Sequence, residues 1–174
     1  MMKETRFIGI MMRYFMVSIS LCFCFFDLNA QQPKYSDCPK CWNPDSLGNH
    51  RVVVNFEGEG NIAKAKIEWR RRDHDPQLKR IIVADAKSNQ EIINVRTGEI
   101  NREFGEIFFE PLAGRWLYYI YYMPYKNEGR SNYPKGTYLQ PKDISNGWSN
   151  TIPQDALVNC RVTAFQSIDS LDSF

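Results

Sequence analysis

One stretch of the sequence restricts the possible folds more than any other. Residues 115–125 (RWLYYIYYMPY) hold six aromatic side chains in eleven positions and are apolar at odd and even positions alike. Successive side chains of a β-strand point to opposite faces, so a strand of this composition has two apolar faces that both need cover. The stretch therefore predicts a central strand in a layered β-protein.

Short segments of strand composition surround this stretch. Residues 63–69 (AKAKIEW) alternate between apolar and charged side chains, which is typical of a strand with one face in water. Turns rich in Gly, Asn, Asp and Pro separate the segments, and no segment of ten residues combines a helical period with capping signals. We expect strands at 51–56, 63–69, 80–84, 91–95, 107–109, 115–125 and 158–165, with a loop at 127–141. This pattern predicts an all-β fold, a single-domain antiparallel β-sandwich.

The first thirty residues have the composition of an export signal. Arg13 precedes a predominantly apolar run of thirteen residues at 14–26, and Ala30 offers a small residue for cleavage. The apolar run is shorter than a membrane span. We expect a signal peptide at 1–30, an extended entry segment at 31–49, the sandwich at 50–174, and a secreted or periplasmic protein. An uncleaved anchor is the alternative, and Met1, Met11 and Met12 are all candidate starts.

Charge argues against one class of partner. The net charge is +2, and without residues 1–30 there remain 19 basic and 18 acidic side chains. A chain with so little net charge lacks the field that attracts nucleic acid or an anionic membrane. We therefore expect no nucleic-acid partner. We also expect that the chain is not an integral membrane protein once the signal is removed.

The mature chain keeps three cysteines, of which Cys38 and Cys41 form a CxxC motif. A four-ligand zinc site needs a second Cys or His pair, and only His50 and His74 are present as helpers. A local disulfide between Cys38 and Cys41, or two free thiols, fits the polar segment around them better than a metal or redox site. The redox state of Cys160 is left open.

Residues 69–76 (WRRRDHDP) combine three arginines with one of the two histidines. Trp69 ends the alternating segment on its apolar face, so we expect its side chain in the core and the following residues in a polar exit from the strand. Asp73, His74 and Asp75 are adjacent and cannot all face one ion, which argues against a metal site there.

Catalytic motifs are not evident. The sequence contains no nucleophile elbow, metalloprotease, P-loop or dinucleotide fingerprint. Glycoside hydrolysis generally needs two carboxylates across the scissile bond. Solvated or ion-paired side chains explain the candidate carboxylates better than a catalytic pair does: Asp73, Asp75, Glu103, Glu106 and Glu110. We expect no catalytic residue, no metal and no cofactor.

Six motifs together resemble the N-terminal domain of bacterial secreted glycoside hydrolases of family 123, the β-N-acetylgalactosaminidases. They occur in the family's order across residues 42–174, as SLGNHR (46–51), WRRRD (69–73), NREFG (101–105), YYIYYMPY (118–125), YPKGTYL (133–139) and FQSIDSLDSF (165–174). The resemblance implies an N-terminal β-sandwich that precedes a catalytic (β/α)₈ barrel. It also implies substrate-assisted catalysis by an acidic pair in that barrel, which no position of this chain matches.

A barrel needs about 250 residues, so the resemblance implies a truncated or split protein, or a stand-alone accessory domain. Its partner would be the catalytic barrel, in the same chain or in another. Polar loops gather at the ends of a sandwich, so we select six candidates for an interdomain or glycan-facing surface: Arg71, Arg72, Asp73, Asn101, Arg102 and Tyr133.

Two other functions are considered. A free-standing carbohydrate-binding module would need an exposed aromatic platform, for which Trp42, Trp148 and Tyr138 are the candidates. An enzyme in its own right would hydrolyse an N-acetylgalactosaminide, which we do not expect of this chain.

Overall fold

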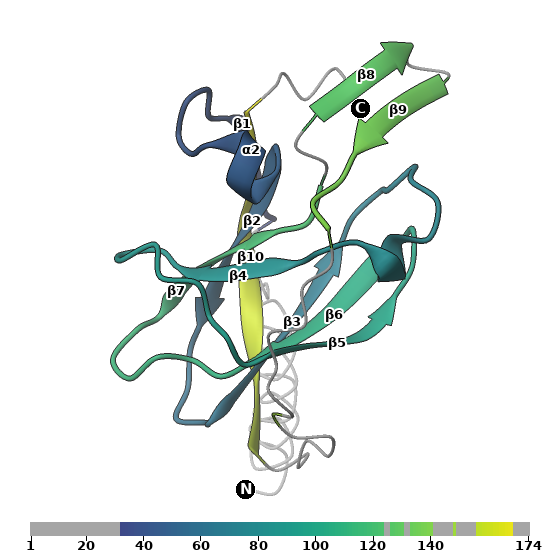
Figure 1. The fold of residues 1–174 in the computed structure, drawn as a ribbon. Coiled ribbons are helices and arrows are strands. Elements are labelled where there is room, and N and C mark those ends of the chain that lie inside the picture. Colours follow the sequence, from purple (N-terminus) through teal and green to yellow (C-terminus); the bar gives the residue numbers. More distant parts are fainter. Residues whose placement is uncertain (1–31, 124–125, 131–132, 141–147, 149–155, 169–174) are drawn as a thin grey trace, which may run out of the picture. The chain divides into compact units, whose positions relative to one another are not determined.

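The structure is a computed structural model of the chain, and it describes residues 32–123, 126–130, 133–140, 148 and 156–168 (Figure 1). The expected signal peptide at 1–30 lies outside these residues. No helix in the part described is long and apolar enough to cross a bilayer.

Strands make up most of the ordered structure, which confirms the all-β prediction. The described residues contain ten strands, one turn of α-helix and one turn of 3₁₀ helix. They are β1 (Lys34–Asp37), α2 (Pro44–Leu47), β2 (His50–Phe56), β3 (Ile62–Glu68), η2 (Pro76–Leu78), β4 (Ile82–Asp85), β5 (Val95–Ile100), β6 (Phe104–Phe109), β7 (Leu117–Tyr121), β8 (Lys126–Arg130), β9 (Tyr133–Thr137) and β10 (Leu157–Ser167).

Eight of these strands form one curled sheet in the order β4-β7-β2-β10-β3-β6-β5, with β1 beside β10. The first part of β10 pairs with β3 in parallel, and the rest pairs with β2 in antiparallel fashion. The register shifts between Val162 and Ala164, where a bulge increases the twist of a strand. β10 thereby joins two arms, one made of β1, β2, β7 and β4 and the other of β3, β6 and β5.

The strand pairing differs from the wholly antiparallel pairing that was expected, because β1 with β10 and β10 with β3 are parallel. The reason is geometric. β2 and β3 follow each other along the chain and run in opposite directions, and β10 lies between them. A strand in that place can be antiparallel to only one of its two neighbours.

Alternate residues of both arms fill a shared core. On β3, Ala63, Ala65 and Ile67 are fully buried, whereas Lys66 and Glu68 are exposed, as the alternation of residues 63–69 predicts. The other arm contributes side chains that are likewise 0% exposed: Val52, Val54, Val83, Tyr118 and Ile120. Burial of this apolar surface is the main force that closes the curled sheet.

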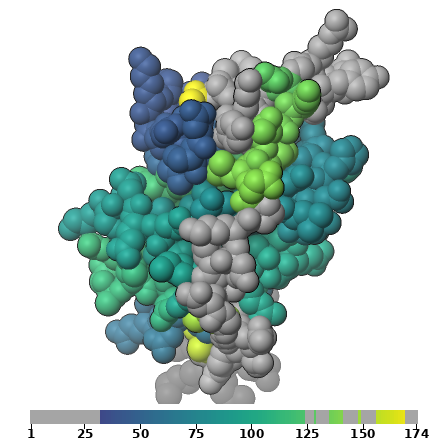
Figure 2. Space-filling view, in the orientation of Figure 1, coloured from purple at the N-terminus to yellow at the C-terminus, as the bar shows by residue number. Residues whose placement is uncertain are grey.

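β7 is the central strand that residues 115–125 predict, since it pairs with β2 on one side and β4 on the other. Tyr118 and Ile120 face the shared core, whereas Tyr121 belongs to a second cluster on the opposite face of the sheet. Residues around α2 and after β9 cover that second cluster through Trp42, Leu47 and Leu139. Figure 2 shows these two covering segments, dark blue and light green, close to each other on one face.

Two segment predictions are wrong in detail. Residues 91–95 form only an isolated bridge at Glu91, and β5 begins at Val95. The expected loop at 127–141 contains the paired strands β8 and β9. Within the expected entry segment at 31–49 the structure has β1, which pairs with β10, and the one-turn helix α2.

Candidate functional site

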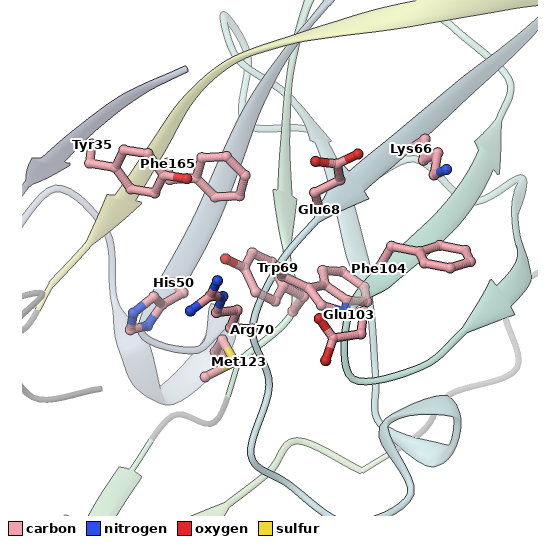
Figure 3. Close-up of a pocket in the computed structure, with 11 residues that line it drawn as sticks. Tyr35, His50, Lys66, Glu68, Trp69, Arg70, Glu103, Phe104, Met123 and Phe165 are labelled. Carbon is pink, nitrogen blue, oxygen red and sulfur yellow. The ribbon is translucent and has the colours of Figure 1, made fainter. Parts of the chain in front are cut away.

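A pocket of about 570 Å³ opens at the end of the curled sheet where β2 begins and β3 ends (Figure 3). Its volume lies within the range of about 300–1,000 Å³ that small-molecule sites occupy. Both arms of the sheet, including β1, contribute to the wall. The lining residues are Tyr35, His50, Lys66, Glu68, Trp69, Arg70, Glu103, Phe104, Tyr122, Met123 and Phe165.

Two stacked aromatic pairs build the apolar part of the wall. Trp69 stacks on Tyr122 with ring centroids 4.9 Å apart, and Tyr35 stacks on Phe165 at 5.0 Å with the rings almost parallel. Trp69, Tyr122 and Phe165 are buried, but Tyr35 is 63% exposed. Tyr35 therefore presents an aromatic surface to solvent beside the pocket.

Charged groups of both signs complete the wall. Lys66, Glu68, Arg70 and Glu103 are all exposed, so two cations and two carboxylates border the same space. Figure 3 shows the Glu68 carboxylate between the Tyr35–Phe165 pair and the Phe104 ring in this view. The wall can donate and accept hydrogen bonds without carrying a net charge.

Trp69 is held in place from two directions. Its indole Nε1 donates to the Asn101 carbonyl oxygen at 2.9 Å, and its backbone amide donates to the Glu103 carbonyl oxygen at 2.9 Å. Gly105 lies against the Trp69 ring so closely that a Cβ there would overlap it. The WRRRD and NREFG motifs are therefore two halves of one packing unit, and the predicted insertion of Trp69 into the core is confirmed.

Arg71 lies in the interior rather than on the surface that the sequence suggested. Its Nε and Nη2 donate to the two carboxylate oxygens of Asp73 at 2.9 and 2.8 Å, and the two side chains are 0% and 5% exposed. The guanidinium lies 5.1 Å from the centre of the Trp69 ring and 6.0 Å from that of Tyr122. Arg71 thus supports the wall of the pocket from behind, and its Nη1 has no hydrogen-bond partner among the described residues.

The other predicted surface residues have mixed positions. Arg72 and Arg102 are exposed, and an Nη2 of Arg102 lies 3.3 Å from Nδ1 of His74. Asn101 is half-buried, and its Oδ1 accepts from the backbone amides of Glu103 and Phe104 at 2.8 Å each, so it shapes the turn.

Backbone pairing brings most of these candidates together. The Arg71 amide donates to the Arg102 carbonyl oxygen at 2.9 Å, which joins the WRRRD and NREFG segments. Tyr133 lies in β9, and its side chain is outside the part that the structure describes.

Sequence reasoning missed Tyr35, Glu68 and Arg70 as site residues. The one available signal was the outward alternation of Lys66 and Glu68 on the same strand segment that ends at Trp69. Tyr35 gave no signal, because its position depends on the pairing of Tyr35 with Phe165 across 130 positions of sequence.

Of the three aromatic residues predicted as a sugar platform, Trp42 and Tyr138 pack against other side chains. The surroundings of Trp148 are only partly described. Trp42 donates from Nε1 to the Gly48 carbonyl oxygen at 2.6 Å and packs on Arg51. Tyr138 is half-buried beneath the ammonium of Lys79, and burial, with the nearby Asp73 carboxylate, raises its pKa. Trp148 is half-buried, and its neighbours in sequence lie outside the described residues.

The cysteines and carboxylates are placed as follows. Cys38 and Cys41 form a disulfide, and Cys160 is a free thiol whose pKa burial raises to about 12. Within the described ranges, no three His, Cys, Asp or Glu side chains gather as a metal site would require. Glu106 forms an ion pair with Lys64 at 2.7 Å, so that carboxylate is occupied on the sheet surface.

A comparison with protein families gives one match. The model described as "Glycoside hydrolase 123, N-terminal domain" matches residues 40–168, which include β2 through β10. Comparisons with curated proteins and with solved structures give no match.

Proposed function

Because the chain belongs to the family of glycoside hydrolase 123 N-terminal domains, we propose that it is a non-catalytic accessory domain that packs on the catalytic domain of an amino-sugar-releasing glycosidase. The family match over residues 40–168 is the observation that carries this proposal. The catalytic acids belong to the partner domain, which is joined to this domain in one polypeptide or supplied by a second one.

The pocket end of the curled sheet is the surface that best fits this contact. β10 finishes at Ser167 close to the pocket, which Phe165 lines, and the family match ends at residue 168. A domain that follows an N-terminal domain of this family would therefore join it at this end.

Charged residues at this end are held on a firm backbone. Arg70, Arg72 and Arg102 are exposed, and amide hydrogen bonds of 2.9 Å from Trp69 and Arg71 tie their two segments together. A preformed surface loses little conformational freedom on docking, which favours stable packing.

Export is part of the proposal. The basic flank, apolar run and small residue within 1–30 support a signal peptide. The Cys38–Cys41 disulfide also supports an oxidising compartment, since such bonds persist in secreted and periplasmic proteins. The mature protein would then begin close to Gln31.

Co-purification tests the accessory role. A separately expressed family 123 catalytic domain should co-elute with this chain on a sizing column. The double variant Arg70→Glu/Arg102→Glu should abolish co-elution, because it reverses two exposed charges at the docking end. Arg161→Glu is the matched control, since Arg161 is exposed and pairs with Glu57 beyond the other end of β2, so it should not change co-elution.

The same preparation tests the absence of catalysis. The chain alone should release no phenol from an aryl N-acetylgalactosaminide, whereas the complex with the catalytic domain should. Turnover by the chain alone, or no co-elution with the catalytic domain, would refute the accessory role.

A further inference from the structure

We propose that the pocket at the β2–β3 end binds one uncharged saccharide unit, with Tyr35 as its stacking platform and Glu68, Arg70 and Glu103 as its polar contacts. This inference deepens the accessory function and rests on it for the choice of an amino sugar. The binding itself is argued from the wall of the pocket.

The platform is the first step of the argument. Tyr35 is 63% exposed, yet its ring is nearly parallel to that of Phe165, with an interplanar angle of 7°. One face of the ring is thus backed by a buried aromatic side chain, and the ring is presented as a supported surface. A pyranose ring has an apolar C–H face, and aromatic side chains offer the matching flat apolar surface with a polar edge.

The polar groups are the second step. A sugar hydroxyl both donates and accepts, so it needs acceptors and donors within reach. Glu68 and Glu103 supply carboxylate acceptors, while Lys66 and Arg70 supply donors, and all four border the same pocket. The buried His50, whose Nδ1 lies 3.0 Å from Oδ1 of Asn49, adds a polar group to the wall.

The balance of charge selects among ligand classes. Two cations and two carboxylates line the pocket, so an anion such as a phosphate would meet as much repulsion as attraction. A purely apolar ligand would strip water from four charged groups and give them no partner, which is costly. An uncharged polyhydroxyl ligand can pair with both signs and also cover the aromatic rings.

The pocket also lies where such a ligand would serve the proposed function. It opens at the end of the sheet, beside the last residues of β10. This is the end that we assign to the contact with the catalytic partner. A sugar unit held here would belong to the same glycan that the partner hydrolyses, and would keep that glycan near the active site.

Titration calorimetry of the full chain with N-acetylgalactosamine, galactose and inorganic phosphate tests the inference. We expect millimolar or tighter binding of N-acetylgalactosamine, weaker binding of galactose, and no binding of phosphate. Tyr35→Ala and Glu68→Gln should each weaken sugar binding at least about fivefold, which corresponds to a binding free energy change of about 1 kcal/mol.

Trp116→Ala is the matched control, because Trp116 is 56% exposed and lies at the other end of the sheet. It should leave the sugar affinity unchanged. Circular dichroism checks that each variant is folded.

Each remaining outcome is decisive. No sugar binding up to tens of millimolar overturns the inference, as does phosphate binding in place of sugar or an equal loss of affinity in Trp116→Ala. Failure of this inference alone would appear as co-elution with the catalytic domain without sugar binding. Sugar binding without co-elution would instead overturn the accessory role.

Discussion

Two buried arginines, Arg51 in β2 and Arg71 just after β3, belong to different arms of the sheet and are neutralised in different ways. Arg71, behind the pocket, forms a two-pronged ion pair with Asp73 and lies near two rings of the shared core. Arg51, on the outer face, lies 4.3 Å from the centre of the Trp42 ring and 3.7 Å from that of Tyr119. In the part of the chain described, no carboxylate lies within ion-pair distance of Arg51.

The polar partners of Arg51 are neutral. Its Nε donates to Oε1 of Gln166 at 2.7 Å, and its Nη1 donates to the Tyr121 hydroxyl at 3.2 Å. Aromatic faces and neutral oxygens therefore stabilise the buried guanidinium of Arg51, as a carboxylate stabilises that of Arg71. The buried charge of Arg71, near the pocket, is therefore coupled to a second charge. The buried charge of Arg51, which lies under Trp42, is not.

Removing the charge of Arg71 should have the largest effect. In Arg71→Met the Asp73 side chain, only 5% exposed, loses its cation. Breaking a buried ion pair in this way costs about 3–5 kcal/mol, and we expect that loss in the free energy of unfolding measured in urea. The double variant Arg71→Met/Asp73→Leu removes both charges and should recover most of the loss. A loss below about 1 kcal/mol in the single variant would show that the pair does not stabilise the pocket wall.

Removing the charge of Arg51 should have an intermediate effect. Arg51→Met leaves no buried carboxylate behind and loses only the cation–π contacts and two hydrogen bonds. We expect a loss of about 1–2 kcal/mol in the same unfolding experiment. Arg51→Lys keeps a cation over the rings and should lose less. If Arg51→Met cost as much as Arg71→Met, the contrast between the two arginines would be wrong.

A third, half-exposed arginine gives the smallest effect and adds a pH dependence. Arg115 lies 3.6 Å from Asp85, which is buried at the start of the turn after β4. Burial raises the pKa of Asp85, but hydrogen bonds from the Ser88 hydroxyl and amide, with the charge of Arg115, outweigh it and hold this pKa below 3.8. Arg115→Met should cost less than about 1 kcal/mol at pH 7, because one side of the pair is open to solvent.

The sign of the pH effect follows from that depressed pKa. Asp85 contributes stability above its unfolded pKa of 3.8, and the contribution disappears as the pH falls through the lower folded value. The wild type should therefore be more stable than Asp85→Asn at pH 7, and the two unfolding curves should converge at acid pH. A stability difference that stays constant below pH 3.8 would contradict this assignment.

Sequence patterns predicted strands well where the apolar pattern of a single segment is enough to identify the strand. The alternation ending at Trp69 and the two apolar faces around Tyr118 both appear as predicted. They failed at β8 and β9, whose residues show no apolar period and include Pro134. Proline is tolerated in an edge strand, and among the described strands β9 pairs only with β8, so tertiary context is needed to recognise β9.

None of the six residues predicted for a binding or interdomain surface lines the pocket, although two of the segments that carry them border it. The WRRRD and NREFG motifs do come together, but polarity misplaced Arg71 on the surface, because a sequence does not show that Asp73 two residues later neutralises it inside. An arginine next to two other arginines suggests a solvated loop, unless the geometry of the Arg71–Asp73 ion pair is known.

The sequence by itself determined what short-range geometry controls: the all-β class, the buried face of β3 and the insertion of Trp69. Only the tertiary structure decided how β10 joins the two arms and where the pocket lies. The physical reason is that strand periodicity depends on the backbone of a single segment. The pocket depends instead on pairings such as Tyr35 with Phe165, which bring distant segments of the chain to the same end of the sheet.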